Sequence, residues 1–388
     1  MKKIFKYLFI SILTLFSLGQ LQRIQLNEAV VFYIHDLLIV IWLILLIKKR
    51  KEKMLFLIRK YFFNYLTYIA ISWIVIGLII NFISHNFTII PLLYIARTIS
   101  YLLFALSLPV AISLTAKSYR YYWFLVGLFI AVSGLVQYLL LPDTRFLWYS
   151  GWDDHYFRLI GTQFDPNFTG IILTTTFFMA QSLWNKQSWI KISASILLTS
   201  TILLTYSRAS FLSFIIGLLL IIFIGYIKSH QKNIFLSIIM GLFILLVPFL
   251  PRPDGEGVKL ERTASISARI ESNRFSLDNL KKHELFFGKG LFTYSNENKT
   301  ETYWPTTAHF PSNLIVFLFT STGIIGLGLA LVILYKTGQY LYHKDTYIFI
   351  SFIAILIHSQ FNHTLFQPFI WLWLTTQIFT IETTRIET

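Results

Sequence analysis

The chain has 388 residues, of which 55% are hydrophobic and only 13% are charged. Soluble domains carry about 25% charged residues, so this composition excludes an ordinary cytosolic enzyme. The sequence has no cysteine, which excludes disulfide bonds, thiolate metal sites and cysteine nucleophiles. A net charge of +15 would suit nucleic acid, but the lysines and arginines lie mainly in short segments between apolar runs, where they orient a membrane protein. We therefore expect membrane lipid as a partner, and not nucleic acid.

Apolar runs of about 17 to 25 residues, the length that crosses a bilayer, follow one another along nearly the whole chain. They predict an all-α polytopic integral membrane protein, with a single transmembrane helical domain over residues 1–388. No small-residue cleavage site follows the first run, so we expect a span there and not a signal peptide. Windows of about 19 residues predict about twelve spans, at residues 4–21, 29–47, 62–83, 89–115, 121–141, 166–184, 189–205, 209–227, 234–250, 312–334, 346–360 and 364–381.

Positive charges alternate between the segments that join these spans. Because positively charged connections stay in the cytoplasm, both termini are predicted to be cytoplasmic. The long segment at residues 251–310 then lies outside by parity and forms an external subdomain. The cytoplasmic set is Lys2, Lys3 and Lys6; Lys48, Lys49, Arg50, Lys51 and Lys53; Lys117 and Arg120; Lys186 and Lys191; Lys228 and Lys232; and Lys336 and Lys344.

Arg158 and the sequence Asp165-Pro166-Asn167 precede the sixth predicted span. A charge at the centre of a membrane helix costs at least about 2.5–3.5 kcal/mol, so charges in or near the membrane require an explanation. Simple helix capping and a role at a site both explain Asp165 and Asn167. Capping does not explain Arg158, because a cation opposes the dipole at a helix N-terminus. An anion held between Arg158 and the helix would remove that conflict.

Arg208 lies in a very short outer turn between the seventh and eighth predicted spans. Such an arginine commonly extends to lipid headgroups. A lone outward arginine in a short turn runs against the positive-inside rule, so we favour anion binding.

The long outer segment carries two further features. Arg269 and Arg274 lie five residues apart in a predicted helix, Ile266 to Lys282, and a solvated charged face would also explain them. Gly288 and Gly290 suit a tight turn, because glycine adopts conformations closed to other residues. No strand precedes them to make a nucleotide motif.

Polar residues also lie within or beside the predicted spans. We expect each to be buried against a partner on another helix, outside any reaction. Asp36 and Arg97 are predicted to form an ion pair. The others are His35, His358, Asn362 and His363.

Four motifs occur in order: Arg-x-x-Gly-x-x-x-Asp-Pro-Asn at 158–167, Tyr-Ser-Arg-Ala at 206–209, Gly-Lys-Gly-Leu-Phe at 288–292 and Thr-Gly-Ile-Ile-Gly at 322–326. Together, around one large outer loop, they resemble the O-antigen polymerase and O-antigen ligase superfamily of bacterial envelope-polysaccharide enzymes, over about residues 155–335. The chain departs from that pattern at one point. Many members have a His-Asn pair where this chain has Ser312 and Asn313, and the nearest histidine is His309.

The resemblance implies the C-type glycosyltransferase architecture and a location in the bacterial inner membrane. It implies transfer of a glycan from undecaprenyl-diphosphate-linked oligosaccharide to an acceptor hydroxyl at the outer face, without metal or cofactor. A chain-length regulator or a flippase would be further partners. Arginine forks would bind the diphosphate, through Arg158, Arg208 and either Arg269 or Arg274. His309 or, failing it, Asp165 would accept the hydroxyl proton, with support from Asn167, Asn313, Gly288 and Gly290.

Three activities suit these features. A polymerase is favoured, because the missing histidine weakens the ligase interpretation more. The alternative is an O-antigen ligase that joins finished polymer to lipid A core or another acceptor. A polysaccharide or lipid transporter fits less well, since the sequence shows no repeated halves with broken helices.

Overall fold

The structure, a computed structural model, describes residues 2–26, 30–62, 65–84, 89–112, 114–184, 188–229, 233–253, 255–293 and 311–381. A helix occupies each predicted span, so the all-α prediction is confirmed for this part of the chain. The helices are α1 (Lys2–Ser17), α2 (Ile34–Phe62), α3 (Tyr65–Ser84), α4 (Ile90–Ala111), α5 (Ala116–Leu140), α6 (Pro166–Leu183), α7 (Trp189–Leu204), α8 (Arg208–Ser229), α9 (Ile234–Leu246), α10 (Ala264–Asp278), α11 (Glu284–Phe287), α12 (Leu314–Lys344), α13 (Thr346–His358) and α14 (Pro368–Ile381). Short 3-10 turns are η1 (Gly19–Gln22), η2 (Arg145–Ser150), η3 (Gly161–Gln163), η4 (Val247–Phe249) and η5 (Glu256–Val258).

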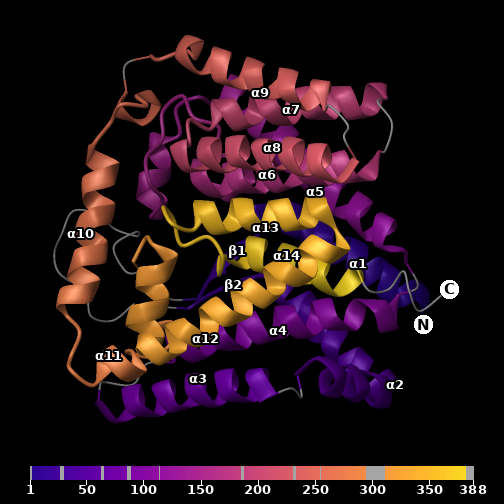
Figure 1. Cartoon of the computed structure of the whole chain (residues 1–388), viewed down its shortest axis with the longest axis vertical. Coiled ribbons are helices and arrows are strands. Elements are labelled where there is room, and N and C mark those ends of the chain that lie inside the picture. The colour runs from indigo at the N-terminus through magenta and orange to yellow at the C-terminus, as the bar shows by residue number, and fades with distance from the viewer. Residues whose placement is uncertain are drawn as a thin grey trace.

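Most of the long helices lie side by side, and α10 runs across their ends (Figure 1). The start of α1 and the end of α14 lie on the side opposite α10 (Figure 1). The segment that contains α10 therefore covers one end of a helical bundle, which is the geometry expected of a surface loop over membrane helices.

Four helices in the described part are long and apolar enough to cross a membrane: Ile90–Ala111, Ala116–Leu140, Arg208–Ile227 and Leu314–Lys344. Shorter apolar helices accompany them, among them Trp189–Leu204 and Thr346–His358. The protein is thus a helical membrane protein, and the count of about twelve spans stays a prediction.

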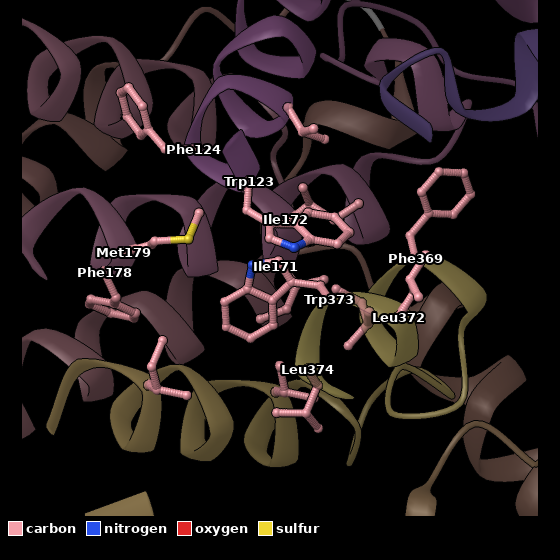
Figure 2. Packing of buried hydrophobic residues seen from close by; sticks show 14 of the residues in the cluster. Trp123, Phe124, Ile171, Ile172, Phe178, Met179, Phe369, Leu372, Trp373 and Leu374 are labelled. Carbon is pink, nitrogen blue, oxygen red and sulfur yellow. The ribbon is translucent and has the colours of Figure 1, made fainter. Parts of the chain in front are cut away.

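The core forms where α5, α6 and α14 meet (Figure 2). Trp123, Phe178 and Trp373, one from each helix, are at most 5% exposed. Large aromatic side chains make extensive contacts when fully buried, so this cluster packs α5 against both α6 and α14.

Two local features differ from the sequence prediction. The basic residues 48–53 belong to α2, which continues to Phe62 with a kink at Arg50, because lysine, glutamate and arginine are good helix formers. A two-stranded antiparallel sheet, β1 (Arg23–Gln25) with β2 (Val31–Tyr33), precedes α2 and was not predicted.

The ion pair between Asp36 and Arg97 is confirmed, with 3.0 Å between Oδ2 and Nη2. Arg97 also donates to the carbonyl oxygen of Val31 at 2.7 Å. The pair joins α2, α4 and the small sheet, as expected of a buried structural pair.

Helix α12 is interrupted at Gly323, which has φ +67°. The freed carbonyl groups of Thr320 and Ser321 accept hydrogen bonds from the backbone N–H of Lys289 and Gly290, both at 2.9 Å. The carbonyl of Thr322 accepts a third, from Trp73 Nε1 at 2.9 Å. In an apolar medium, unsatisfied backbone groups are costly, so this break fixes where the outer segment returns to the bundle.

Glycine is required on both sides of that contact. A Cβ on Gly288 would collide with the backbone of Ser321, and one on Gly323 with the backbone of Phe286. Gly288 and Gly290 also have positive φ, +72° and +97°. The predicted tight turn is therefore confirmed, and its glycines allow a close approach to α12.

We expect Gly323→Ala to lower the free energy of unfolding by about 1–3 kcal/mol, because the residue combines positive φ with a backbone collision. The matched control is Gly328→Ala on the same helix, where a Cβ meets open space. Thermal unfolding of the purified variants in detergent measures both. Equal midpoints for the two variants would contradict the proposed role of the break.

Candidate functional site

The face of α10 that turns toward the bundle is polar. The helix begins two residues earlier and ends four residues earlier than the predicted stretch 266–282. The residues of this face recur at helical spacing and are buried or half-buried: Ser265, Arg269, Ser272, Asn273 and Ser276. An outer helix that turns polar groups toward helix ends is suited to bind a polar ligand between them.

Arg269 and Arg274 point in different directions. Arg269 Nη2 donates to Asn362 Oδ1 at 3.1 Å. The side chain of Arg274 is 81% exposed, and its Nε lies 3.4 Å from Asp278 Oδ2 on the same helix. Of the two candidates, Arg269 turns toward the bundle.

Arg158 precedes α6, but its guanidinium lies at the end of α7. Nε donates to the carbonyl of Thr205 at 3.0 Å, and Nη2 to that of Tyr206 at 3.4 Å. These groups belong to a helix C-terminus, where the dipole favours a cation. The sequence argument inferred an anion from a cation that opposes the dipole at the N-terminus of α6. That argument is wrong, because the guanidinium lies at the C-terminus of α7. Diphosphate binding by Arg158 stays a prediction.

Arg208 binds the outer segment and does not extend to lipid headgroups. Nη1 donates to the carbonyls of Leu260 and Arg262, at 3.0 and 2.8 Å, and Nη2 donates to Ser265 Oγ at 2.9 Å. Arg262 in turn donates to the carbonyl of Tyr206 at 3.3 Å. These two arginines fasten the start of α10 to the start of α8.

Asp165 caps α6, as one of the two open interpretations predicted. Its Oδ1 accepts from the N–H of Asn167 and Phe168, at 2.6 and 2.9 Å. The side chain of Asn167 does something different, because its Oδ1 accepts from Ser207 Oγ at 2.9 Å. Asp165 Oδ2 and Asn167 Nδ2 have no partner among the described residues, so both atoms are available to a ligand.

The cations outnumber the acids around this point. Burial, and then Arg262, lowers the pKa of Arg158 to about 9. Burial also lowers the pKa of Arg269, which Asp165 counteracts and Arg208 reinforces. Burial raises the pKa of Asp165, against the N–H groups it accepts and the nearby Arg158 and Arg269. Asp165 and Asp153 are the carboxylates that act on these arginines. Guanidiniums in excess over nearby carboxylates would be stabilised by an anion.

Asn313 connects α10 and α12 to the turn that follows α13. Asn313, the N-cap of α12, accepts from two N–H groups of its own helix through Oδ1 and donates from Nδ2 to the carbonyl of Gln360 at 3.2 Å. Its backbone N–H donates to Asn273 Oδ1 at 3.2 Å. Asn313 therefore links α10, α12 and this turn. His309 lies outside the described residues.

Residues 193–331 match a family model described as O-antigen ligase. This similarity supports the predicted resemblance to the O-antigen polymerase and ligase superfamily. The matched segment runs from α7 into α12 and includes Arg208, Arg269 and Asn313, whereas Arg158 and Asp165 precede it. No curated protein matches the chain.

Several residues of the site were not predicted. Arg262 was treated as one member of a charged run, and Ser207 only as part of a motif. Asn362 was assigned to a buried partner outside the reaction, yet it binds Arg269. Among the described residues, no group of His, Asp or Glu side chains is placed to hold a metal ion.

We expect Arg208→Ala to loosen the start of α10, because the carbonyls of Leu260 and Arg262 lose a donor. Hydrogen–deuterium exchange should accelerate about tenfold or more over residues 260–267, since hydrogen bonds to a charged group contribute about 1.5–3 kcal/mol. Arg274→Ala, on the exposed side of α10, is the control and should leave that exchange unchanged. Unchanged exchange in Arg208→Ala would show that these bonds do not hold the segment.

Proposed function

We propose that this protein is a polysaccharide polymerase of the bacterial inner membrane that uses an undecaprenyl-diphosphate-linked glycan donor. The observation that carries the proposal is a set of neighbouring arginines at one end of an apolar helical bundle. Arg158 and Arg269 lie near Asp165, while Arg262 lies near Arg158 and Arg208 near Arg269. A polyprenyl diphosphate presents a multiply charged head directly above its hydrocarbon tail. Guanidinium donors above apolar helices match a ligand with a charged head and a hydrocarbon tail.

Arg269 has the most capacity for a ligand. Its only bond to the described residues is from Nη2 to Asn362 Oδ1, so most of its N–H groups are unused. Arg208, by contrast, makes three bonds to the outer segment. We assign direct diphosphate binding to Arg269, with Arg158 and Arg208 supplying charge and the remaining donors.

The transfer step requires stabilisation of a leaving diphosphate. A hydroxyl oxygen of the acceptor sugar attacks the anomeric carbon, and the bond from that carbon to the diphosphate oxygen breaks. The displaced diphosphate keeps the electron pair and gains negative charge, which the arginines stabilise. Direct displacement inverts the configuration at the anomeric carbon.

The hydroxyl proton needs an acceptor. Asp165 is the candidate in the described part of the chain, because Oδ1 is occupied by capping while Oδ2 is unpartnered. Burial raises the pKa of Asp165, which makes its ionised form a stronger base. His309 remains the other candidate.

We expect Arg269→Ala to raise the KM for lipid-linked donor by about tenfold to a hundredfold, because a hydrogen bond to a charged group contributes about 1.5–3 kcal/mol. Chain growth by purified protein on lipid-linked oligosaccharide measures it. Arg274→Ala is matched in chemistry and helix but points away, and should behave as wild type. A normal KM and kcat in Arg269→Ala would refute the diphosphate assignment.

An O-antigen ligase is the second candidate, favoured because the family model that residues 193–331 match is one of O-antigen ligases. Deleting the gene in its native cell should separate the two. Loss of a polymerase leaves single repeat units attached to lipid A core, whereas loss of a ligase leaves none attached. Gel analysis of the lipopolysaccharide distinguishes these outcomes, and the second pattern would overturn the polymerase assignment. Translocation without chain growth by the reconstituted protein would instead indicate a transporter.

A further inference from the structure

A chain of buried side chains connects the turn after α13 to Asn167. His358 Nδ1 lies 2.6 Å from Thr364 Oγ1, and His358 Nε2 lies 3.2 Å from Ser210 Oγ. Ser210 Oγ donates to Ser207 Oγ at 2.9 Å, and Ser207 Oγ donates to Asn167 Oδ1 at 2.9 Å. His358, Ser207 and Ser210 are fully buried. The chain crosses three helices, α13, α8 and α6.

The bond at the Asn167 end of the chain has a fixed direction. Ser207 Oγ donates to Asn167 Oδ1, and Ser210 Oγ can donate to Ser207 Oγ at 2.9 Å or to the carbonyl of Asn167 at 3.3 Å. His358 lies between the hydroxyl groups of Ser210 and Thr364, and Thr364 Oγ1 can also donate to the carbonyl of Asn362 at 3.1 Å. Either neutral tautomer of His358 therefore links Ser210 to Thr364.

The end of the chain fixes the amide of Asn167. An asparagine amide can flip, exchanging its oxygen and nitrogen. The Ser207 hydroxyl holds Oδ1 in place, so Nδ2 must face the other way. Asn167 is half-buried, and Nδ2 has no partner among the described residues, so its N–H groups are presented to whatever occupies the site.

The same turn also holds Arg269. Asn362 Oδ1 accepts from Arg269 Nη2, while the backbone of Asn362 accepts from the N–H of Thr364 at 2.7 Å. The turn therefore orients two donors at once, the guanidinium of Arg269 directly and the amide of Asn167 through His358. None of His358, Asn362 and Thr364 lies in the segment 193–331 that matches the family.

We propose that His358, Ser210 and Ser207 are positioning residues that aim the Asn167 amide at a phosphoryl oxygen of the donor diphosphate. This inference rests on the proposed function. An anionic oxygen is favoured over a neutral sugar hydroxyl because Arg158 and Arg269 give this location an excess of positive charge. Asn167 and Arg269 then bind one ligand from two sides.

The first test is Asn167→Asp. Aspartate keeps the oxygen that accepts from Ser207, but it replaces the N–H donors by a negative oxygen. We expect an unchanged melting temperature and a KM for lipid-linked donor that rises about tenfold to a hundredfold. The kcat should change much less, since the lost interaction is with bound donor. A KM equal to that of wild type would overturn the inference.

The second test compares His358→Gln with His358→Leu. Glutamine can place a hydrogen-bonding group near the position of Nε2, whereas leucine of similar bulk cannot form a hydrogen bond. We expect Leu to raise the donor KM about tenfold and Gln to restore it to within about threefold. Equal KM values for the two variants would contradict an orienting role, because a merely structural effect would not depend on whether the side chain can form the hydrogen bond.

Ser207→Ala repeats the test without changing the histidine. Its matched control is Ser213→Ala, because Ser213 is likewise a buried serine, lies within α8 and among the described residues donates only to the carbonyl of Ala209 in its own helix, at 2.8 Å. Only Ser207→Ala should raise the donor KM.

Arg269→Ala distinguishes failure of this inference from failure of the proposed function. If it raises the donor KM while Asn167→Asp does not, the inference fails and the proposed function stands. If neither substitution has an effect, both fail.

Discussion

Backbone carbonyl groups that no helix satisfies determine where the arginines of this protein lie. The carbonyls of Thr205 and Tyr206 bind Arg158, and those of Leu260 and Arg262 bind Arg208. A carbonyl buried near a membrane surface without a donor is costly. A guanidinium can satisfy two carbonyls at once and still have N–H groups left, which a lysine cannot do in a fixed geometry. Arg208 therefore holds the outer segment and Arg158 holds the end of α7, while both contribute positive charge to the candidate site.

This double use explains the excess of positive charge. A site built only for stability would balance its arginines with carboxylates, as Asp36 balances Arg97 within the bundle and Asp345 balances Arg120 at 2.6 Å. Asp165 is not paired in this way, because no guanidinium in the described part lies within 4.0 Å of its carboxylate. The contrast within one chain separates structural pairs from a cluster that an anionic ligand would complete.

The sequence predicted those parts of the structure that depend on local pattern. Apolar runs located the helices, and the glycines at 288 and 290 indicated a tight turn. It also predicted the pair of Asp36 and Arg97, because a charge within a span needs a partner. It did not predict the hydrogen bond of Asn362 to Arg269, since these residues are 93 positions apart. Nor could the sequence place Arg158 at the end of α7. Arg158 precedes α6 in the chain, so the sequence argument considered only the dipole of α6.

The N-terminus of α6 shows how a capping residue can retain a second role. Capping uses only Asp165 Oδ1, and it fixes the carboxylate plane so that Oδ2 has one direction. The neighbouring Asn167 is fixed in the same way, with Oδ1 held by Ser207. Each side chain thus commits one atom to the fold and presents the other, an acceptor from Asp165 and a donor from Asn167. Held in this way, the Asn167 amide could bind a diphosphate and the Asp165 carboxylate could receive the proton of the acceptor sugar's hydroxyl. Neither side chain would have to reorganise during transfer, which is the condition for electrostatic stabilisation of a transition state.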